Sequence, residues 1–324
     1  FMKTYYTSDL QKGMSLNGET FAVKEVQLTE TKAKKPYYRV TLIDKTGSIS
    51  GNIWGDKFSQ IEKSSLKVGK VVVIDAVVEE FKGALTLNIE RVNGVSEAVL
   101  DEYVEGSDFD LDELMGILDE FINEISDSKI KKYLQSLFQD DEFRSKYKIH
   151  PAAEYVHHSF RGGLLEHVLE MLELSKSLKK YYPEANYDIV TLGIILHDVG
   201  KLDELSVEGT VVQRTPKGYL LGHIALGLEF IEKTASEKLD EEQLMLLKHI
   251  ILSHHGSLEF GSPVLPSTIE ASIVSELDSS SSQVRIFQKI VRKSKNREDN
   301  FSDWDNILRT KVYQSKQNDE LRLI

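Results

Sequence analysis

The spacing of apolar and polar positions divides the chain into two parts with different periods. Between about residues 14 and 95, short runs rich in β-branched and aromatic residues alternate with turn signals, which is the pattern of β-strands. Lys45-Thr46-Gly47 and Lys82-Gly83 stand where tight turns are expected. The five predicted strands are ETFAVKEVQL (19–28), YYRVTLID (37–44), SISGNIW (48–54), KVVVIDAVVEEF (70–81) and ALTLNIERV (84–92).

A short helical stretch, DKFSQIEKSSL (56–66), separates the third and fourth predicted strands. Five strands with a helix at that place form the layout of an OB-fold, a small β-barrel that often binds oligonucleotides. Another kind of small β-barrel is the alternative that the pattern leaves open.

From about Glu97 onward the apolar residues recur at helical spacing. The segment from Leu111 to Ile125 shows the clearest apolar stripe, and Asp110 and Asp112 suit the N-terminal end of a helix electrostatically. The Ser279–Ser282 run predicts an exposed turn, and QRTPKGYLLGH (213–223) predicts a polar loop. The predicted helices are 111–125, 129–138, 164–182, 187–196, 223–235, 241–252 and 284–293.

The composition limits which side chains can bind a metal, whereas it says little about the fold. The chain of 324 residues has 40% apolar and 28% charged residues, which is typical of a soluble globular protein. It has no cysteine, so any metal must be held by His, Asp or Glu. We find no secretory signal and no run of about 18 apolar residues, and we therefore expect a cytoplasmic protein that does not enter a membrane.

The net charge of −12 is a local feature of the chain. Twelve acidic residues and no basic residue lie between Glu97 and Asp127, and the remaining 40 acids equal the 40 bases. Net charge therefore does not exclude a nucleic-acid partner, because a protein of this kind can still carry a basic groove.

Several histidines and aspartates stand at or near the ends of predicted helices. His197 and Asp198 end one apolar helix, and His254 and His255 end another. Neutral imidazole and carboxylate suit borderline divalent metals, and a carboxylate can bridge two ions. A structural metal or buried polar helix ends are the alternative. The candidate ligands in chain order are His167, His197, Asp198, His223, His254, His255 and Asp278.

This order of ligands on helices resembles the HD phosphohydrolase superfamily, whose central motif is similar to HDVGK (197–201). Three further stretches are distinctive: HPAAEYVHHSFRGGLLEHVL (150–169), LLGHI (220–224) and SHHGSLEFGSPVLPSTIEA (253–271). Through these stretches and the order of its domains, nearly the whole chain resembles the YhaM-type 3′→5′ exoribonucleases, which join an N-terminal OB-fold to an HD domain. SSSSQ (279–283) departs from the family pattern directly after Asp278.

The resemblance implies two divalent metal ions. Mn²⁺ is expected first, with Mg²⁺, Fe²⁺ and Zn²⁺ as alternatives. One ion would be held by His167, His197, Asp198 and Asp278, and the other by Asp198, His223, His254 and His255. Asp198 would then be the catalytic residue that bridges the two ions.

The implied reaction is hydrolysis of the last phosphodiester at the 3′ end of single-stranded RNA, with release of a nucleoside 5′-monophosphate. Single-stranded DNA is left open as a second substrate. Lys201 would neutralise phosphate charge, and Gly200 would allow a tight turn. His158, with His157 beside it, and Arg161 are catalytic candidates that would contact phosphate, and a structural role for them is an equal alternative.

The barrel offers candidates for binding a single strand, because aromatic side chains can stack on bases while basic ones contact the backbone. The adjacent Tyr37 and Tyr38 must face opposite sides of their strand, so some of these aromatic residues belong to the core. Lys217 is a similar candidate in the polar loop. The full set is Tyr37, Tyr38, Trp54, Phe81, Lys34, Lys35 and Lys217.

The predicted fold class is therefore a multidomain α and β protein with a small β-barrel (OB-fold) followed by an all-α HD domain. The predicted domains are residues 1–96 (OB-fold), 97–149 (an acidic helical linker packed on the HD domain) and 150–324 (the HD domain with a helical tail). Two other functions stay open: a phosphohydrolase of small nucleotides, and an accessory factor that binds single strands around a structural metal. The sequence leaves the oligomeric state open.

Overall fold

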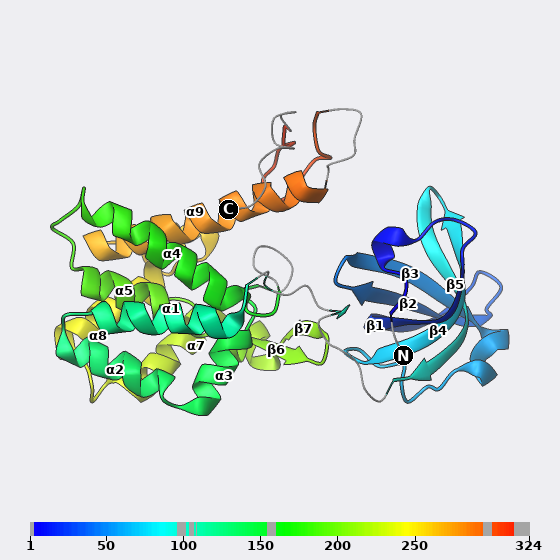
Figure 1. Ribbon diagram of the computed structural model, residues 1–324, viewed down its shortest axis with the longest axis horizontal. Helices are drawn as coiled ribbons and strands as arrows, with labels where there is room; N and C mark the ends of the chain where they lie inside the picture. The colour runs from blue at the N-terminus through cyan, green and yellow to red at the C-terminus, as the bar shows by residue number, and fades with distance from the viewer. Residues whose placement is uncertain are drawn as a thin grey trace. The chain divides into compact units, whose positions relative to one another are not determined.

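A computed structural model gives the positions of most of the chain and divides it into two compact units (Figure 1). The first unit comprises residues 1–108 and 205–214, and the second comprises 109–204 and 215–324. The finer division into domains at residues 96 and 149 stays a prediction. The structure describes residues 3–95, 102–103, 107, 109–153, 160–293 and 300–313.

The first unit contains a closed barrel of five strands in the order β1-β2-β3-β5-β4 (Figure 1). Strands β3 and β5 pair in parallel, and the other pairs are antiparallel. A 3₁₀ helix, η2, lies between β3 and β4 and confirms the predicted helical element, although it is shorter than expected. The fold is OB-like, as predicted. The bounds are η1 Thr7–Asp9, β1 Ser15–Glu30, β2 Pro36–Asp44, β3 Gly47–Trp54, η2 Gly55–Gln60, β4 Val71–Phe81 and β5 Ala84–Gly94.

Alternating side chains of these strands fill the barrel, since successive strand residues point to opposite faces. Phe21, Ile53 and Leu87 are fully buried in this core. The predicted turn between β4 and β5 is confirmed: Lys82 (φ 54°) and Gly83 (φ 81°) both have positive φ and join the paired residues Phe81 and Ala84. Two consecutive positive-φ residues match the twist of the flanking strands.

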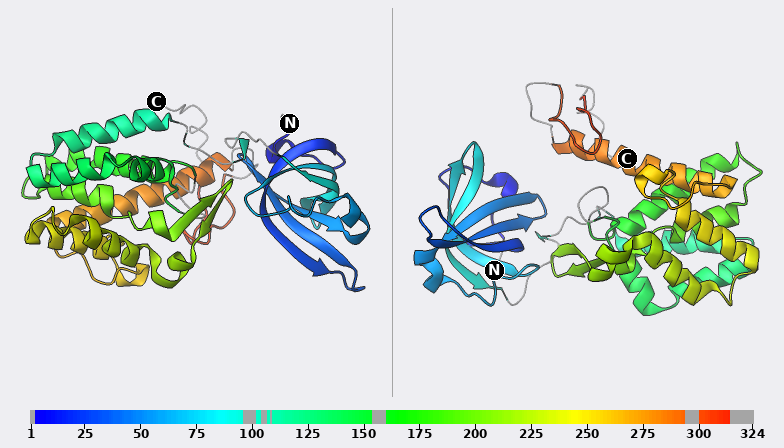
Figure 2. Two further views of the ribbon diagram at one scale, coloured as in Figure 1. Left: turned by 90° about the horizontal axis from the view of Figure 1, so that it is seen from below. Right: turned by 180° about the vertical axis from the view of Figure 1, so that it is seen from behind.

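The second unit is helical (Figure 2). Several of its helices begin at an acidic or amide side chain that accepts backbone hydrogen bonds: Asp110 accepts from Asp112 and Glu113, and Asn186 accepts from Asp188 and Ile189. Such caps satisfy N–H groups that have no partner inside the helix. The bounds are α1 Leu111–Glu124, α2 Ser128–Phe138, α3 Asp141–Ile149, α4 Gly163–Lys179, α5 Tyr187–Leu196, α6 Lys201–Glu204, α7 Pro216–Ala235, α8 Glu241–Ser253, η4 Leu258–Phe260 and α9 Ile269–Lys293. The hairpin strands β6 Leu205–Glu208 and β7 Val211–Arg214 lie between α6 and α7 in the chain and belong to the first unit.

Helix α5 packs against α4, α8 and α9 and also contacts α2. Its apolar residues are buried on all sides, for example Val190, Ile194 and Leu196. A helix that is apolar all round belongs inside a protein, and each such side chain contributes about 1.5–3 kcal/mol by burial. The C-terminal end of α5 therefore carries His197 and Asp198 into the interior.

Two segments differ from the sequence predictions. The Ser279–Ser282 run is not a turn but lies inside the continuous helix α9, where Ser281 is buried at 1% exposure. The predicted loop 213–223 contains the end of β7 and the first turns of α7, and Gly222 (φ 71°, ψ 162°) interrupts that helix directly before His223. In the first case the run is part of a helix that packs against α4, which a local pattern does not reveal. In the second case the helix begins at a local signal, the Thr215 cap followed by Pro216. No helix in the described part of the chain is long and apolar enough to cross a membrane.

Candidate metal centre

All seven predicted ligands lie in the helical unit, and five of them stand at or next to a helix end or a helix break. His167 lies one turn into α4, and His197 and His254 are the C-terminal caps of α5 and α8. His223 directly follows the break in α7. Asp278 lies in the interior of α9 and so does not stand at a helix end.

The donor atoms of these residues gather in two groups of three. His223, His254 and His255 form one group, and His167, His197 and Asp278 form the other. Within each group the nearest donor atoms all lie within 4.8 Å of one another. These are the two groups that the family resemblance implied, apart from the shared aspartate.

Asp198 lies between the two groups. Its Oδ2 is 3.4 Å from His197 Nε2, and its Oδ1 is 3.6 Å from His254 Nε2 and 3.7 Å from His223 Nε2. The two carboxylate oxygens thus face different groups. This is the placement that a bridging carboxylate requires.

The far side of each buried ring is held by a hydrogen bond that fixes which nitrogen faces the cluster. His197 Nδ1 donates to the Ile194 carbonyl at 2.8 Å, and His254 Nδ1 donates to the Ile251 carbonyl at 2.8 Å. His255 Nδ1 donates to the Phe260 carbonyl at 2.9 Å. A carbonyl can only accept, so the neutral ring carries its proton on Nδ1 and presents the bare Nε2 to the cluster.

The other two rings contact side chains that sequence reasoning did not identify. His223 Nδ1 faces the Glu204 carboxylate at 3.2 Å, and Glu204 is only 5% exposed. His167 Nδ1 lies 3.1 Å from Ser281 Oγ. A carboxylate behind a ligating imidazole orients the ring and increases its basicity. In the sequence Glu204 is one of many acids, and only its burial distinguishes it.

The helix that carries Asp278 is fastened to the helix that carries His167. Arg285 on α9 contacts Glu170 at 2.9 Å and Glu166 at 3.2 Å, both on α4. Asp278 Oδ1 lies 3.2 Å from His167 Nε2. These contacts hold α9 in the register that brings Asp278 to the cluster.

Charge within the cluster keeps both carboxylates ionised. Burial opposes ionisation, but Lys201 and His197 hold the pKa of Asp198 well below its usual value. The pKa of Asp278 is likewise lowered, because His167 and His197 outweigh the effect of burial. Burial lowers the pKa of His254, which favours the neutral ring that a metal needs.

Buried atoms without a hydrogen-bond partner provide the test of whether this site suits a metal. Among the described residues, His197 Nε2, His254 Nε2 and Asp198 Oδ1 are buried and have no such partner. An unpaired buried polar atom costs about 1–3 kcal/mol. Imidazole nitrogens and carboxylate oxygens are ligands for Mn²⁺, Fe²⁺ or Zn²⁺, so divalent cations held by the two donor groups would satisfy these atoms.

The comparisons with known proteins agree with this geometry. The HD domain family matches residues 164–283, a range that includes all seven candidate ligands. The 3′-5′ exoribonuclease YhaM of Listeria monocytogenes is 31% identical over 268 residues, which cover 81% of this chain and 83% of that protein. The protein of the same name from Bacillus subtilis is 30% identical over 297 residues, which cover 88% of this chain and 93% of that protein. The chain belongs to the YhaM family of 3′-5′ exoribonucleases.

A solved structure also resembles part of this YhaM-family chain. The second OB-fold domain of replication protein A from Methanococcus maripaludis is 19% identical with a TM-score of 0.24, and the alignment covers 29% of this chain and 97% of that domain. The OB-like assignment of the barrel depends on its own strand order. The HD domain implies that the enzyme depends on a divalent metal.

Lys201 and Gly200 complete the central motif of this YhaM-family chain. Lys201 Nζ lies 2.6 Å from Asp198 Oδ2, and its side chain is mostly buried. The predicted tight turn at Gly200 is present, since the Lys201 N–H donates to the Asp198 carbonyl at 2.9 Å. The close approach of α7 adds a second reason for glycine, because a Cβ there would lie 1.9 Å from the His223 carbonyl oxygen and 2.5 Å from the Gly227 nitrogen. Only glycine lets the HD loop approach α7 so closely.

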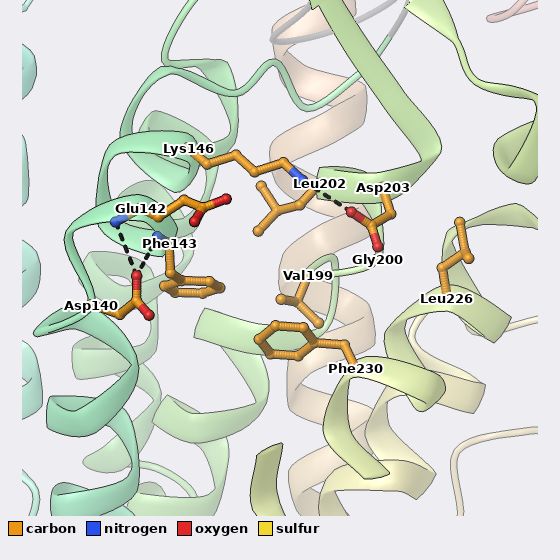
Figure 3. A pocket seen from close by; sticks show the side chains of 10 residues that line it. All are labelled: Asp140, Glu142, Phe143, Lys146, Val199, Gly200, Leu202, Asp203, Leu226 and Phe230. Carbon is orange, nitrogen blue, oxygen red and sulfur yellow. Dashed lines mark hydrogen bonds and ion pairs between the residues drawn. The ribbon is translucent and has the colours of Figure 1, made fainter. Parts of the chain in front are cut away.

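A small cavity of about 200 Å³ lies beside this loop but is separate from the donor cluster (Figure 3). Phe143 and Phe230 line it and stack on each other with ring centroids 5.5 Å apart, and Val199 and Gly200 form part of its wall. Lys146 and Asp203 pair at 3.0 Å at its rim. None of the seven candidate ligands lines it.

Among the remaining predicted catalytic residues, His157 and His158 lie outside the described residues. Arg161 is exposed and directly precedes Gly162, whose left-handed conformation (φ 84°) begins α4. Lys217 is exposed in the first turn of α7.

The predicted strand-binding residues of the barrel lie in two different environments. Tyr37 and Trp54 are partners across β2 and β3, with ring centroids 5.0 Å apart, and Trp54 is 38% exposed. Tyr38 packs against the barrel core and against Phe58, as the alternation along a strand requires. Phe81 is 66% exposed in the hairpin of β4 and β5, and Lys34 and Lys35 are exposed between β1 and β2.

Proposed function

We propose that the protein is a metal-dependent 3′→5′ exoribonuclease that degrades single-stranded RNA to nucleoside 5′-monophosphates. The observation that carries the proposal is the pair of donor groups with Asp198 between them, in a chain of the YhaM family. An acid-and-imidazole cluster of this kind is the ligand set of an enzyme that hydrolyses phosphate esters with metal ions.

The seven donors would hold two divalent ions, with Mn²⁺ as the expected metal. His167, His197, Asp198 and Asp278 would hold one, and Asp198, His223, His254 and His255 would hold the other. Two such ions, when bound, activate water and stabilise the attacking and leaving oxygens of a displacement at phosphorus. The absence of cysteine from the chain fits a site for oxygen and nitrogen ligands.

The chain's own side chains contribute to binding the scissile phosphate. Lys201 faces Asp198 and would place its positive charge beside a phosphate bound there. Arg161, exposed at the start of the helix that carries His167, would contact the adjacent phosphate, and His158 is proposed for the same task. Asp198 would serve as the central catalytic group.

The barrel would bind the single strand away from the bond that is cut. Tyr37, Trp54 and Phe81 would stack on bases, and Lys34 and Lys35 would contact the backbone. Tyr38 enters the proposal only through its contact with the core, which fixes the strand that presents Tyr37. Lys217 is proposed as a further backbone contact in the helical unit. Because RNA is the proposed substrate, the proposed location is the cytoplasm.

The test follows an RNA oligomer that carries a label at its 5′ end. With Mn²⁺ we expect a ladder that shortens from the 3′ end and release of nucleoside 5′-monophosphates, and we expect chelation to stop the reaction. A DNA oligomer of the same sequence and free nucleotides serve as parallel substrates. Turnover of free nucleotides without shortening of RNA, or binding of RNA without cleavage at any divalent metal, would overturn the proposal.

A further inference from the structure

Exposed apolar side chains gather on the two segments that carry the second donor group. Tyr219 (71% exposed) and Leu220 (84%) have the most exposed large apolar side chains in the described chain, and they lie three and two residues before Gly222, where α7 is interrupted. Leu258 and Phe260, at 61% and 69%, lie three and five residues after His255. Single exposed apolar residues are common on soluble proteins, but such a gathering beside a reactive centre indicates a binding surface.

The two segments meet at the donor group itself. His223 Nε2 lies 3.2 Å from His255 Nε2, so the ligands that the segments carry are in contact. Phe260 is tied to the same ring, because its carbonyl accepts the hydrogen bond from His255 Nδ1. The exposed Phe260 ring thus belongs to a residue whose backbone touches a candidate ligand.

The loop that presents Phe260 is held by its own hydrogen bonds. Ser257 Oγ accepts from the Glu259 N–H, and the Ser257 carbonyl accepts from the Ser262 N–H at 3.2 Å. Gly261 (φ 96°) closes the 3₁₀ turn by donating to the Leu258 carbonyl. These hydrogen bonds fix the backbone that presents the exposed Phe260 side chain. A preorganised surface of this kind loses less conformational entropy when a ligand binds.

We propose that Phe260, with the neighbouring apolar side chains, stacks on the base of the 3′-terminal nucleotide whose phosphodiester is cut. A base and its phosphate are joined through one sugar, so a phosphate at the donor cluster brings its base to the cluster's edge. An aromatic face stacks on any base, which suits an enzyme that removes every nucleotide in turn. This inference depends on the proposed exoribonuclease function and adds the site that receives the terminal base.

The experiment compares two RNA oligomers that differ only at the 3′-terminal nucleotide, which either carries its base or is abasic. In the wild-type protein we expect kcat/KM to be about 5- to 140-fold higher for the oligomer with the base, the range for one stacked base at about 1–3 kcal/mol. Phe260→Ala should reduce this preference to nearly one. Phe260→Trp should keep it, and so should Phe287→Ala, which removes an exposed phenylalanine from α9.

A purely structural role for Phe260 gives a different result. The backbone carbonyl that holds His255 is present in every variant, and disturbance of that ring would slow both oligomers equally. Equal slowing with an unchanged preference would therefore overturn the inference, as would a wild-type preference of one. If the wild-type protein cuts neither oligomer, the exoribonuclease function itself fails, a result distinct from cleavage without preference.

Discussion

The donor cluster of the helical unit is buried, whereas the candidate strand-binding residues of the barrel lie at its surface. His167, His197 and His254 are at most 1% exposed, and each ring contacts a partner on the side away from the cluster. Trp54 and Phe81 are 38% and 66% exposed. The first site is fixed by many contacts, and the second by few.

The difference shows that the sequence fixes the positions of the buried donor side chains more firmly than those of the exposed aromatic side chains. A buried imidazole must have a partner for each nitrogen, so its position is set by the helices around it and by what it binds. An exposed aromatic side chain has water as an alternative partner and can be exchanged at little cost in stability. Substitutions in the cluster should therefore cause large losses of activity or metal affinity. Substitutions on the barrel surface should cause smaller losses of RNA affinity.

The largest expected effect is that of Asp198→Asn. The residue lies between both donor groups, so its loss should weaken both metal sites and lower kcat for RNA at least about 1,000-fold, since several kcal/mol of transition-state stabilisation depends on such ions. Asp203→Asn is the matched control, because Asp203 is exposed five residues later and pairs only at the surface with Lys146. Activity within tenfold of wild type in a folded Asp198→Asn protein would contradict the assignment.

A smaller effect is expected from Glu204→Gln, which leaves an acceptor for His223 but removes the charge behind the ring. Partners of this kind typically contribute 10–100-fold to metal affinity, and we expect a loss of about tenfold because the hydrogen bond is kept. Titration calorimetry with Mn²⁺ measures it. Glu229→Gln, an exposed acid on the helix that carries His223, should bind the metal as the wild type does. Equal affinities in all three proteins would show that Glu204 serves only the fold.

The sequence indicated the seven candidate ligands, whose donor atoms the structure brings together, but not the residues that contact them from behind. HDVGK is a local motif, and most of the candidate ligands stand at helix ends that apolar periodicity can locate. Glu204 and Ser281 act through contacts between segments far apart in the chain, which no local pattern contains. The Ser279–Ser282 run was wrongly predicted as a turn, because its helical state depends on the packing of α9 against α4.

The same limit applies to the barrel. Strand runs and turns were predictable from alternation and from Lys82-Gly83, and the OB-like order followed from the element sequence. Alternation also required Tyr37 and Tyr38 to face opposite sides. It could not decide which of them faces the core, since that depends on contacts such as the one between Tyr38 and Phe58.

Trp54→Ala tests whether the exposed aromatic side chains of the barrel bind single-stranded RNA. Loss of one partly exposed stacking surface should weaken binding of single-stranded RNA about 5- to 20-fold, the lower part of the range for one stacked base. Fluorescence anisotropy of a labelled oligomer, measured with chelator so that no cleavage occurs, gives the affinity. Tyr181→Ala removes a 70% exposed aromatic side chain from the helical unit and should leave binding unchanged. Similar losses in both variants would assign the binding surface elsewhere.

The smallest effect concerns a buried histidine that serves the fold of the helical unit. His150 is 3% exposed and donates from Nε2 to the Lys201 carbonyl at 2.8 Å. Burial lowers the pKa of this imidazole to about 4. An unfolded chain has a histidine pKa of about 6.5, so between these values the unfolded state binds a proton that the folded state excludes.

His150 should therefore destabilise the folded protein as pH falls from about 6.5 towards 4. One pH unit below the unfolded pKa, at pH 5.5, the loss of unfolding free energy from this residue should be roughly 1 kcal/mol. His150→Gln retains an N–H donor and does not titrate, so urea unfolding in chelator should show a smaller loss between pH 7 and pH 5.5 in the variant. The other buried histidines are present in both proteins and cancel in the difference. Equal losses of unfolding free energy in the two proteins would mean that the imidazole of His150 is charged in the folded state. Its hydrogen bond to the Lys201 carbonyl would then have to be reassigned.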